Sequence, residues 1–205
     1  MLRKLPIVAV FGQGTALTAE RARLARAVGA MVARLGAHLL TGGGYGVMAA
    51  AAEGFVATTP RTGLSIGIVP REPDGPLDEP NHDLDGKTYP NPFVEIAIMT
   101  PLPPRVDGWT RVPARNHVNV FTAHGIVALP GGPGTSNELE MAVFYRGESQ
   151  RPREQRRTIL IGPVEEFTPA QRDQFVHAAT LEVAGHHLRA IMARHGFALT
   201  PEMVS

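Results

Sequence analysis

The chain has 205 residues, 43% of them hydrophobic, and a formal net charge of +1. This length suits a single core, so we expect one domain over residues 1–205, and the near-neutral charge does not favour nucleic acid or an anionic membrane as a partner. The absence of cysteine excludes disulfides, thiolate nucleophiles and thiolate metal sites. We expect a cytoplasmic protein, because residues 1–6 lack the apolar stretch of a signal peptide and no apolar run could span a bilayer.

Strand and helix patterns alternate along the chain. Short apolar runs predict strands at residues 7–11, 38–41, 64–69, 93–99, 125–129 and 158–161. Helical spacing predicts helices from Thr18 as N-cap to Gly36, at about 47–57, at 115–121, after residue 138, and from about 169 to 194 with Gly185 as a candidate break. This alternation predicts an α/β fold, a Rossmann-like open parallel β-sheet with helices on both faces.

Three glycine-rich loops each follow a predicted strand, at residues 12–15, 42–46 and 131–135. Loops of this kind meet at the carboxyl edge of a parallel sheet, where ligands bind. The first loop lacks the third glycine of a dinucleotide fingerprint, because Leu17 stands there, and no convincing acidic residue ends the second strand. A mononucleotide or phosphosugar therefore fits better than a nicotinamide dinucleotide, and we expect no cofactor and no metal.

The third loop reads Pro-Gly-Gly-Pro-Gly-Thr from residue 130 and joins a buried strand to an amphipathic helix. Such a turn exposes backbone N–H groups at the positive end of the helix dipole, and glycines let an anion approach the backbone. Thr135 adds a hydroxyl, and Glu138 stands about one turn into the helix. The pattern favours a phosphate-binding loop with a carboxylate beside it over a turn without a ligand.

The pattern Pro-Gly-Gly-x-Gly-Thr-x-x-Glu at 130–138 resembles the signature of the LOG ("Lonely Guy") family. LOG proteins are phosphoribohydrolases that release a free base from a nucleoside 5′-monophosphate, and were long mislabelled lysine decarboxylases. Residues 41–48 are similar to the family's second glycine segment, and residues 66–70 to the strand that follows it. The resemblance implies a catalytic arginine fifteen residues before the signature proline, which is Arg115 here, acting with Glu138.

Other features resemble the molybdenum-cofactor carrier branch of the same superfamily. These are the shorter second glycine segment and the pair Arg115-Asn116. An unusual insertion over residues 101–112, before this pair, departs from plant-type LOG enzymes and also favours the carrier. Carriers of that branch bind a pterin phosphate cofactor without cleaving it. Two hypotheses therefore stand, a hydrolase of N-glycosidic bonds and a carrier or sensor without chemistry.

The chemistry of the hydrolase hypothesis follows from residue types. Breaking the bond between ribose and base develops positive charge on the sugar, which the carboxylate of Glu138 can stabilise, or it can position a water. Arg115 stays protonated, so it can clamp a phosphate or polarise the departing base but cannot be a base itself. The structural alternative is an ion pair of these two residues that ties two helices together.

The complete predicted site has two catalytic residues, Arg115 and Glu138. The predicted phosphate and nucleotide contacts are Gly12, Gly14, Thr15, Gly43, Gly44, Gly46, Met48, Asn116, Gly131, Gly132, Gly134 and Thr135. The expected partner is a small nucleotide or phosphosugar, with no nucleic acid and no membrane. Family resemblance and apolar helix residues such as Leu139, Val143 and Phe144 favour a homodimer.

The sequence also bears on one alternative activity and on two segments of unusual composition. Lysine decarboxylation is rejected, because pyridoxal phosphate needs a lysine and the only lysines, Lys4 and Lys87, are far in sequence from every glycine loop. The Pro- and Asp-rich stretch 70–92 is either a lid or a surface excursion. The arginine cluster at 151–157 is interpreted as a solvated linker rather than a nucleic-acid contact.

Overall fold

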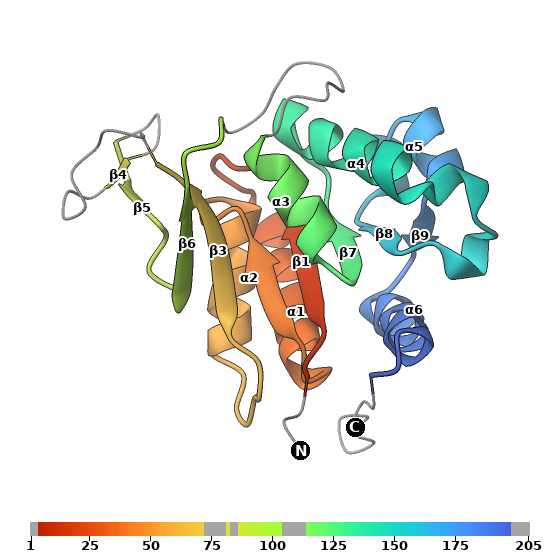
Figure 1. Cartoon of the computed structure of the whole chain (residues 1–205), viewed down its shortest axis with the longest axis horizontal. Helices are drawn as coiled ribbons and strands as arrows, with labels where there is room; N and C mark the ends of the chain where they lie inside the picture. Colours follow the sequence, from red (N-terminus) through yellow and green to blue (C-terminus); the bar gives the residue numbers. More distant parts are fainter. Residues whose placement is uncertain (1–3, 72–80, 83–85, 104–113, 198–205) are drawn as a thin grey trace.

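The computed structural model describes residues 4–71, 81–82, 86–103 and 114–197 (Figure 1). Much of the predicted lid and most of the insertion at 101–112 lie outside these residues. The strands are β1 (Ile7–Phe11), β2 (His38–Thr41), β3 (Ser65–Pro70), β4 (Asn81–His82), β5 (Thr88–Tyr89), β6 (Ile96–Thr100), β7 (Gly125–Ala128), β8 (Thr158–Ile161) and β9 (Val176–Ala178). The helices are α1 (Ala19–Arg34), α2 (Val47–Val56), α3 (Arg115–Thr122), α4 (Pro133–Arg146), α5 (Pro169–Gln174) and α6 (Leu181–Arg194), with short 3-10 turns η1 (Glu148–Gln150), η2 (Arg153–Gln155) and η3 (Val164–Glu166).

Seven strands form one sheet in the order β6-β3-β2-β1-β7-β8-β9, and every neighbouring pair in it is parallel. The chain runs outward from β1 through β2 and β3 to β6, and then returns to the other side of β1 as β7. The strand order therefore reverses between β1 and β7. The predicted fold class, a Rossmann-like parallel sheet with helices on both faces, is confirmed.

Successive side chains of β1 point to opposite faces of the sheet and belong to two separate core clusters. Val8 and Val10 belong to a cluster with residues of α1, α2 and α6, whereas Ala9 and Phe11 belong to a cluster with residues of α3 and α4. All four side chains are buried, because the central strand is covered on both faces. Figure 1 shows α1 and α2 behind the sheet and α3 in front of it.

Helices α1 and α2 touch through their backbones. A Cβ on Gly29 would lie 1.8 Å from the carbonyl oxygen of Ala51, and one on Gly54 would lie 2.0 Å from that of Arg26. Because only glycine fits at this distance, the two helices that follow the first and second glycine loops are fixed against each other. Helix α1 begins as predicted, with the Thr18 side chain accepting a hydrogen bond from the backbone N–H of Arg21.

The predicted single helix over residues 169–194 is wrong. Helix α5 ends at Gln174, the short strand β9 pairs in parallel with β8, and α6 begins after Thr180, whose side chain accepts from the N–H of Val183. Gly185 lies inside α6 and does not break it. Pairing with the sheet edge decides this segment, and helical periodicity carries no information on such a distant partner.

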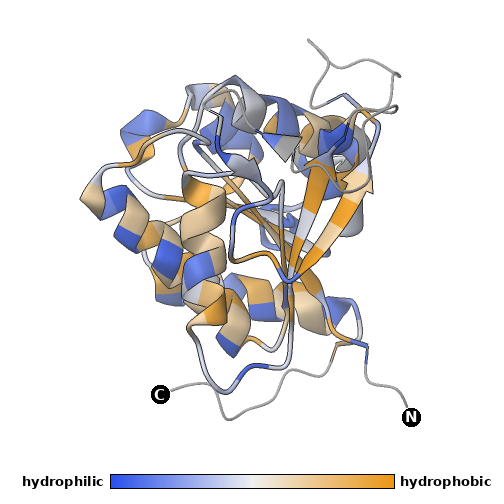
Figure 2. Cartoon of the chain, turned by 90° about the vertical axis from the view of Figure 1, so that its left-hand side faces the viewer, coloured by the Kyte–Doolittle hydropathy of each residue, from blue (hydrophilic) through white to orange (hydrophobic). Residues whose placement is uncertain are grey.

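Several large apolar side chains of β6, α3 and α4 are exposed. Ile96 and Ile98 of β6 are 40% and 46% exposed, and Phe121 of α3 and Phe144 of α4 are 56% and 48% exposed. Figure 2 views the molecule from the β6 edge of the sheet and shows hydrophobic residues along the edge strands. Leu139, which was expected to contribute to pairing, is instead buried in the core.

No helix of the described segments is both long enough and apolar enough to cross a membrane.

Candidate functional site

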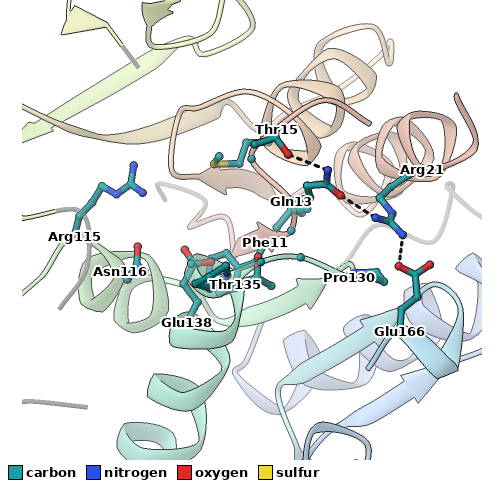
Figure 3. Close-up of a pocket in the computed structure, with 18 residues that line it drawn as sticks. Phe11, Gln13, Thr15, Arg21, Arg115, Asn116, Pro130, Thr135, Glu138 and Glu166 are labelled. Atoms are coloured by element: carbon teal, nitrogen blue, oxygen red, sulfur yellow. Dashed lines mark hydrogen bonds and ion pairs between the residues drawn. The ribbon is translucent and has the colours of Figure 1, made fainter. Parts of the chain in front are cut away.

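A cavity of about 860 Å³ lies at the carboxyl ends of β1 and β7, where the strand order reverses (Figure 3). This is the position at which parallel sheets of this kind bind ligands. Most of the residues predicted from the sequence line it: Gly12, Gly14, Thr15, Met48, Arg115, Asn116, Gly131, Gly132, Gly134, Thr135 and Glu138. Gly43, Gly44 and Gly46 do not line it.

The third glycine loop forms the floor of the cavity. It is anchored by the N–H of Leu129, which donates to the carbonyl of Phe11 at 2.9 Å. Gly132 is the N-cap of α4 and has no side chain to accept from the first turn, so the N–H groups of Gly134 and Thr135 remain open to an anion, whereas Pro133 has no N–H. A Cβ on Gly132 or on Gly134 would meet no protein atom within 4 Å. Packing within the protein does not require these two glycines, and space for a ligand beside the backbone does account for them.

The second glycine loop does not line the cavity, but it contacts the first glycine loop and Arg115, which do. A Cβ on Gly46 would lie 2.2 Å from the carbonyl oxygen of Gln13, so the first and second loops are in backbone contact there. Asn91 Nδ2 donates to the carbonyls of Gly43 and Gly44 at 3.0 and 2.7 Å. Asn91, a buried residue at the end of the Pro- and Asp-rich stretch, is thus part of the support of the site, which the sequence did not indicate.

Arg115 is held at the wall of the cavity. Its Nη1 donates to the carbonyl of Gly42 at 3.0 Å and to Tyr89 Oη at 3.3 Å, and its buried Nε has no hydrogen-bond partner. Both Arg115 and Glu138 lie in the described part of the chain, and no ion pair joins them. The structural alternative, a salt bridge that ties α3 to α4, is therefore excluded. Tyr89 was not predicted as a site residue.

Glu138 projects from α4 into the cavity and is 8% exposed. Burial raises the pKa of its carboxyl to about 7, against the opposing effects of the Arg115 charge and of Asn119, whose Nδ2 donates to Oε1 at 3.2 Å. Desolvation dominates because the nearest cation is directed to Gly42 and Tyr89 rather than to the carboxylate. The site therefore holds a carboxyl group that changes its charge near neutral pH.

Asn116 joins α3 to α4 next to this carboxyl group. Its Nδ2 donates to Asn137 Oδ1 at 3.1 Å, and its own Oδ1 is buried without a hydrogen-bond partner. Because Asn116 lines the cavity, the structure has an unsatisfied acceptor beside it.

The end of the cavity opposite Arg115 contains a network that the sequence did not reveal. Arg21 of α1 forms an ion pair with Glu166 of η3, and its Nη1 donates to Gln13 Oε1 at 2.9 Å. Gln13 Nε2 in turn donates to Thr15 Oγ1 at 2.9 Å, so the pair also fixes the first glycine loop. Figure 3 shows this network on one side of the third loop and Arg115 on the other. Residues 145 positions apart meet here, which no local pattern predicts.

None of the histidines and lysines considered from the sequence lines the cavity. His117 Nδ1 accepts from the N–H of Ala114 at the start of α3, and His124 Nδ1 accepts from the N–H of Ile7. Neither Lys4 nor Lys87 lines the cavity, and the ammonium group of Lys87 lies over the ring of Tyr45. Within the described residues, no group of three or more histidine, cysteine or acidic side chains could hold a metal ion.

Comparison with known proteins gives a family and a set of similar structures. The family model described as LDcluster4, SLOG cluster4 family, matches residues 5–149. An uncharacterised protein of Archaeoglobus fulgidus is 30% identical over 140 residues, which cover 68% of this chain and 75% of that protein.

Two of the similar solved structures belong to proteins that bind or carry the molybdenum cofactor. The molybdenum cofactor binding protein of Rippkaea orientalis is 26% identical with a TM-score of 0.64, covering 92% of this chain and 98% of that one. The molybdenum cofactor carrier protein of Chlamydomonas reinhardtii is 25% identical with a TM-score of 0.63, covering 93% and 99%. The predicted resemblance to the LOG superfamily and its carrier branch is confirmed.

The raised pKa of Glu138 predicts a pH-dependent cost to stability. Between pH 4.5 and about 7 the folded protein keeps the proton of Glu138, whereas the unfolded chain has lost it. Unfolding is therefore favoured as pH rises through this window, by about 3 kcal/mol in total. Glu138→Gln removes this titration, so its free energy of unfolding relative to wild type should increase between pH 4.5 and pH 8 in urea denaturation.

The matched control is Glu140→Gln, which changes an exposed carboxylate of the same helix. A difference between Glu138→Gln and wild type that stays constant from pH 4.5 to pH 8 would contradict the assigned pKa.

Proposed function

The chain belongs to the SLOG cluster4 family, and we propose that it hydrolyses the N-glycosidic bond of a nucleoside 5′-monophosphate to a free base and ribose 5-phosphate. The observation that carries this proposal is the position of Glu138, a desolvated carboxyl group in the same cavity as an open helix N-terminus.

The phosphate is proposed to bind at the third glycine loop. The first turn of α4 offers N–H groups and the positive end of the helix dipole, and Thr135 adds a hydroxyl at the cavity wall. Gly132 and Gly134 leave the adjacent space empty of protein atoms. A phosphate there needs no lysine or metal to be bound.

The sugar is proposed to lie beside Glu138, about one helical turn from Thr135. As C–N cleavage proceeds, positive charge develops on the sugar, and an ionised Glu138 stabilises it or positions the attacking water. The raised pKa means that the group is ionised only above about pH 7. The bond to the base breaks, water supplies the hydroxyl at C1′, and the departing base takes a proton.

The base is proposed to lie toward Arg115. Its guanidinium is held at the end of β2 by Gly42 and Tyr89, away from the loop that follows β7. From there it can donate to a ring nitrogen or carbonyl and stabilise the negative charge of the leaving base.

A carrier or sensor without turnover is the second candidate function. It is favoured by the two molybdenum-cofactor proteins, which resemble this chain over more than nine-tenths of its length. A phosphorylated pterin would use the same loop for its phosphate. In that case Glu138 has no catalytic role, and ligand binding proceeds without product.

Turnover distinguishes the two functions. Purified protein is incubated with a panel of nucleoside 5′-monophosphates, and free base and ribose 5-phosphate are quantified by chromatography. We expect both products in equal amounts, with kcat/KM rising up to about pH 7 and levelling above it. Glu138→Gln should lower kcat by about two orders of magnitude with binding largely kept, whereas Glu140→Gln should act as wild type. Tight binding of a monophosphate without any product would favour the carrier.

The glycines of the loop give a test of ligand position. Gly134→Ala in α4 and Gly185→Ala in α6 both replace a helical glycine, so both should preserve or raise stability, by up to about 1 kcal/mol. Only Gly134 lines the cavity, so only Gly134→Ala should weaken the binding of adenosine 5′-monophosphate in calorimetry, by about tenfold or more. Equal affinities for the two variants would refute a phosphate at this loop.

The homodimer is a further part of the proposal. Ile96 and Ile98 of the edge strand β6 are exposed on the α3 side of the sheet, and a second copy of the chain would bury them. Phe121 of α3 and Phe144 of α4 are further exposed apolar side chains. In parallel register Ile98 faces the same side as Ile68, which is buried in the core cluster of that side.

We expect light scattering to give twice the chain mass of 22.0 kDa. Ile98→Asp should convert the dimer to monomer, because it places a charge in the buried interface. Val183→Asp, at a residue of α6 that is 47% exposed, is the matched control and should remain dimeric. A monomeric wild type at micromolar concentration would refute the interface.

A further inference from the structure

A second, smaller cavity lies at the amino edge of the sheet, away from the glycine loops. It has a volume of about 140 Å³ and lies between the segment that leads into β8 and the last turn of α6. We refer to it as the amino-edge cavity. Its lining residues are Arg151, Gln155, Arg157, Ile191, Arg194 and His195.

The arginine cluster of residues 151–157 divides into two kinds of side chain. Arg153 Nη2 donates to the carbonyl of Arg172 at 3.3 Å, and Arg156 Nη1 donates to that of Asp173 at 2.6 Å, so these two fix the segment to α5. Arg151 and Arg157 line the amino-edge cavity. The cluster is therefore not a uniformly solvated linker, because two of its members help to build a cavity.

Three cationic side chains converge on this cavity. Burial lowers the pKa of Arg157, and the neighbouring charges of Arg151 and Arg194 lower it further, against the effect of Glu148. Glu148 is fully buried, and its Oε2 accepts from the backbone N–H of Arg157 at 2.7 Å. The favourable interaction of a cation with the helix dipole explains an arginine at the position of Arg194, in the last turn of α6. The convergence of three guanidinium groups on one small space is not explained in this way.

We propose that the amino-edge cavity binds a small phosphate anion, either orthophosphate or the terminal phosphate of a phosphomonoester. Guanidinium groups from two separate elements offer paired N–H donors to phosphate oxygens, and His195 adds a ring nitrogen. The bound anion adds to the charge of Glu148 in offsetting the repulsion among the three cations. This site is independent of the function proposed for the carboxyl edge.

The shape of the site favours a small anion over a nucleic acid. A nucleic-acid surface needs cations spread along a groove that follows successive phosphates. Here the cations surround one space of about 140 Å³, which accommodates a single phosphate group. Arg153 and Arg156, which could extend the positive surface, are directed to backbone carbonyls.

The test follows the two candidate phosphate sites separately by NMR. The imidazole resonances of His195 report the amino-edge cavity, and the amide resonance of Gly134 reports the third glycine loop. Titration with sodium phosphate should shift the His195 signals saturably, whereas sodium chloride at the same ionic strength should not. Arg157→Ala/Arg194→Ala should weaken the His195 response about tenfold or more and leave the Gly134 response unchanged.

Two further variants guard against a general effect of lost charge or lost structure. Arg23→Ala removes an exposed arginine of α1 and should respond as wild type, and the single change Arg194→Gln at an exposed position should weaken phosphate binding with the fold intact. Three results would overturn the proposal. These are a His195 response that never saturates, one reproduced by chloride, or one seen only with an oligonucleotide and not with orthophosphate.

Discussion

The parallel pairing of β7 with β1 is the constraint on which the candidate site depends. It brings Ala128 opposite Phe11, so the loops that follow these residues leave the sheet side by side. Helix α1 then packs on one face and α4 on the other, which opens a space between their first turns. Pairing of β7 at the other edge of the sheet, next to β6, would leave the same glycines in the sequence but would place three strands between the two loops. The cavity is thus a property of strand order before it is a property of any side chain.

Within that cavity the two charged groups are kept apart. The guanidinium of Arg115 is held by the carbonyl of Gly42 and by Tyr89, and Glu138 is left in a desolvated position with an amide donor from Asn119. A direct ion pair would have fixed the carboxylate in its charged form and satisfied both groups. Their separation leaves each with unused interaction capacity, which a ligand can take up. Both candidate functions use the loop and the arginine, and they differ in whether the carboxyl group takes part in chemistry.

The sheet also has two distinct polar edges. The carboxyl edge combines helix N-termini, the buried carboxyl group of Glu138 and the ion pair of Arg21 with Glu166. The amino edge collects arginine side chains around a much smaller space. Strand β8 begins next to Arg157 at the amino edge and is followed by η3, which carries Glu166 at the carboxyl edge. The buried strand β8 therefore runs from the amino-edge cavity toward the cavity at the carboxyl edge.

The sequence by itself determined the elements whose signals are local. Thr18 as a helix cap, the strands that precede each glycine loop and the position of Glu138 one turn into α4 all follow from spacing over a few residues, and the parallel sheet follows from their alternation. Only the tertiary structure decided the short strand β9, the support of the second loop by Asn91, and the meeting of Arg21 with Glu166. These contacts join residues from 17 positions apart, for Ile159 with Val176, to 145 positions apart, for Arg21 with Glu166, and each depends on which strands are neighbours. Spacing along the chain encodes which face of an element is buried, but it does not encode which distant segment covers that face.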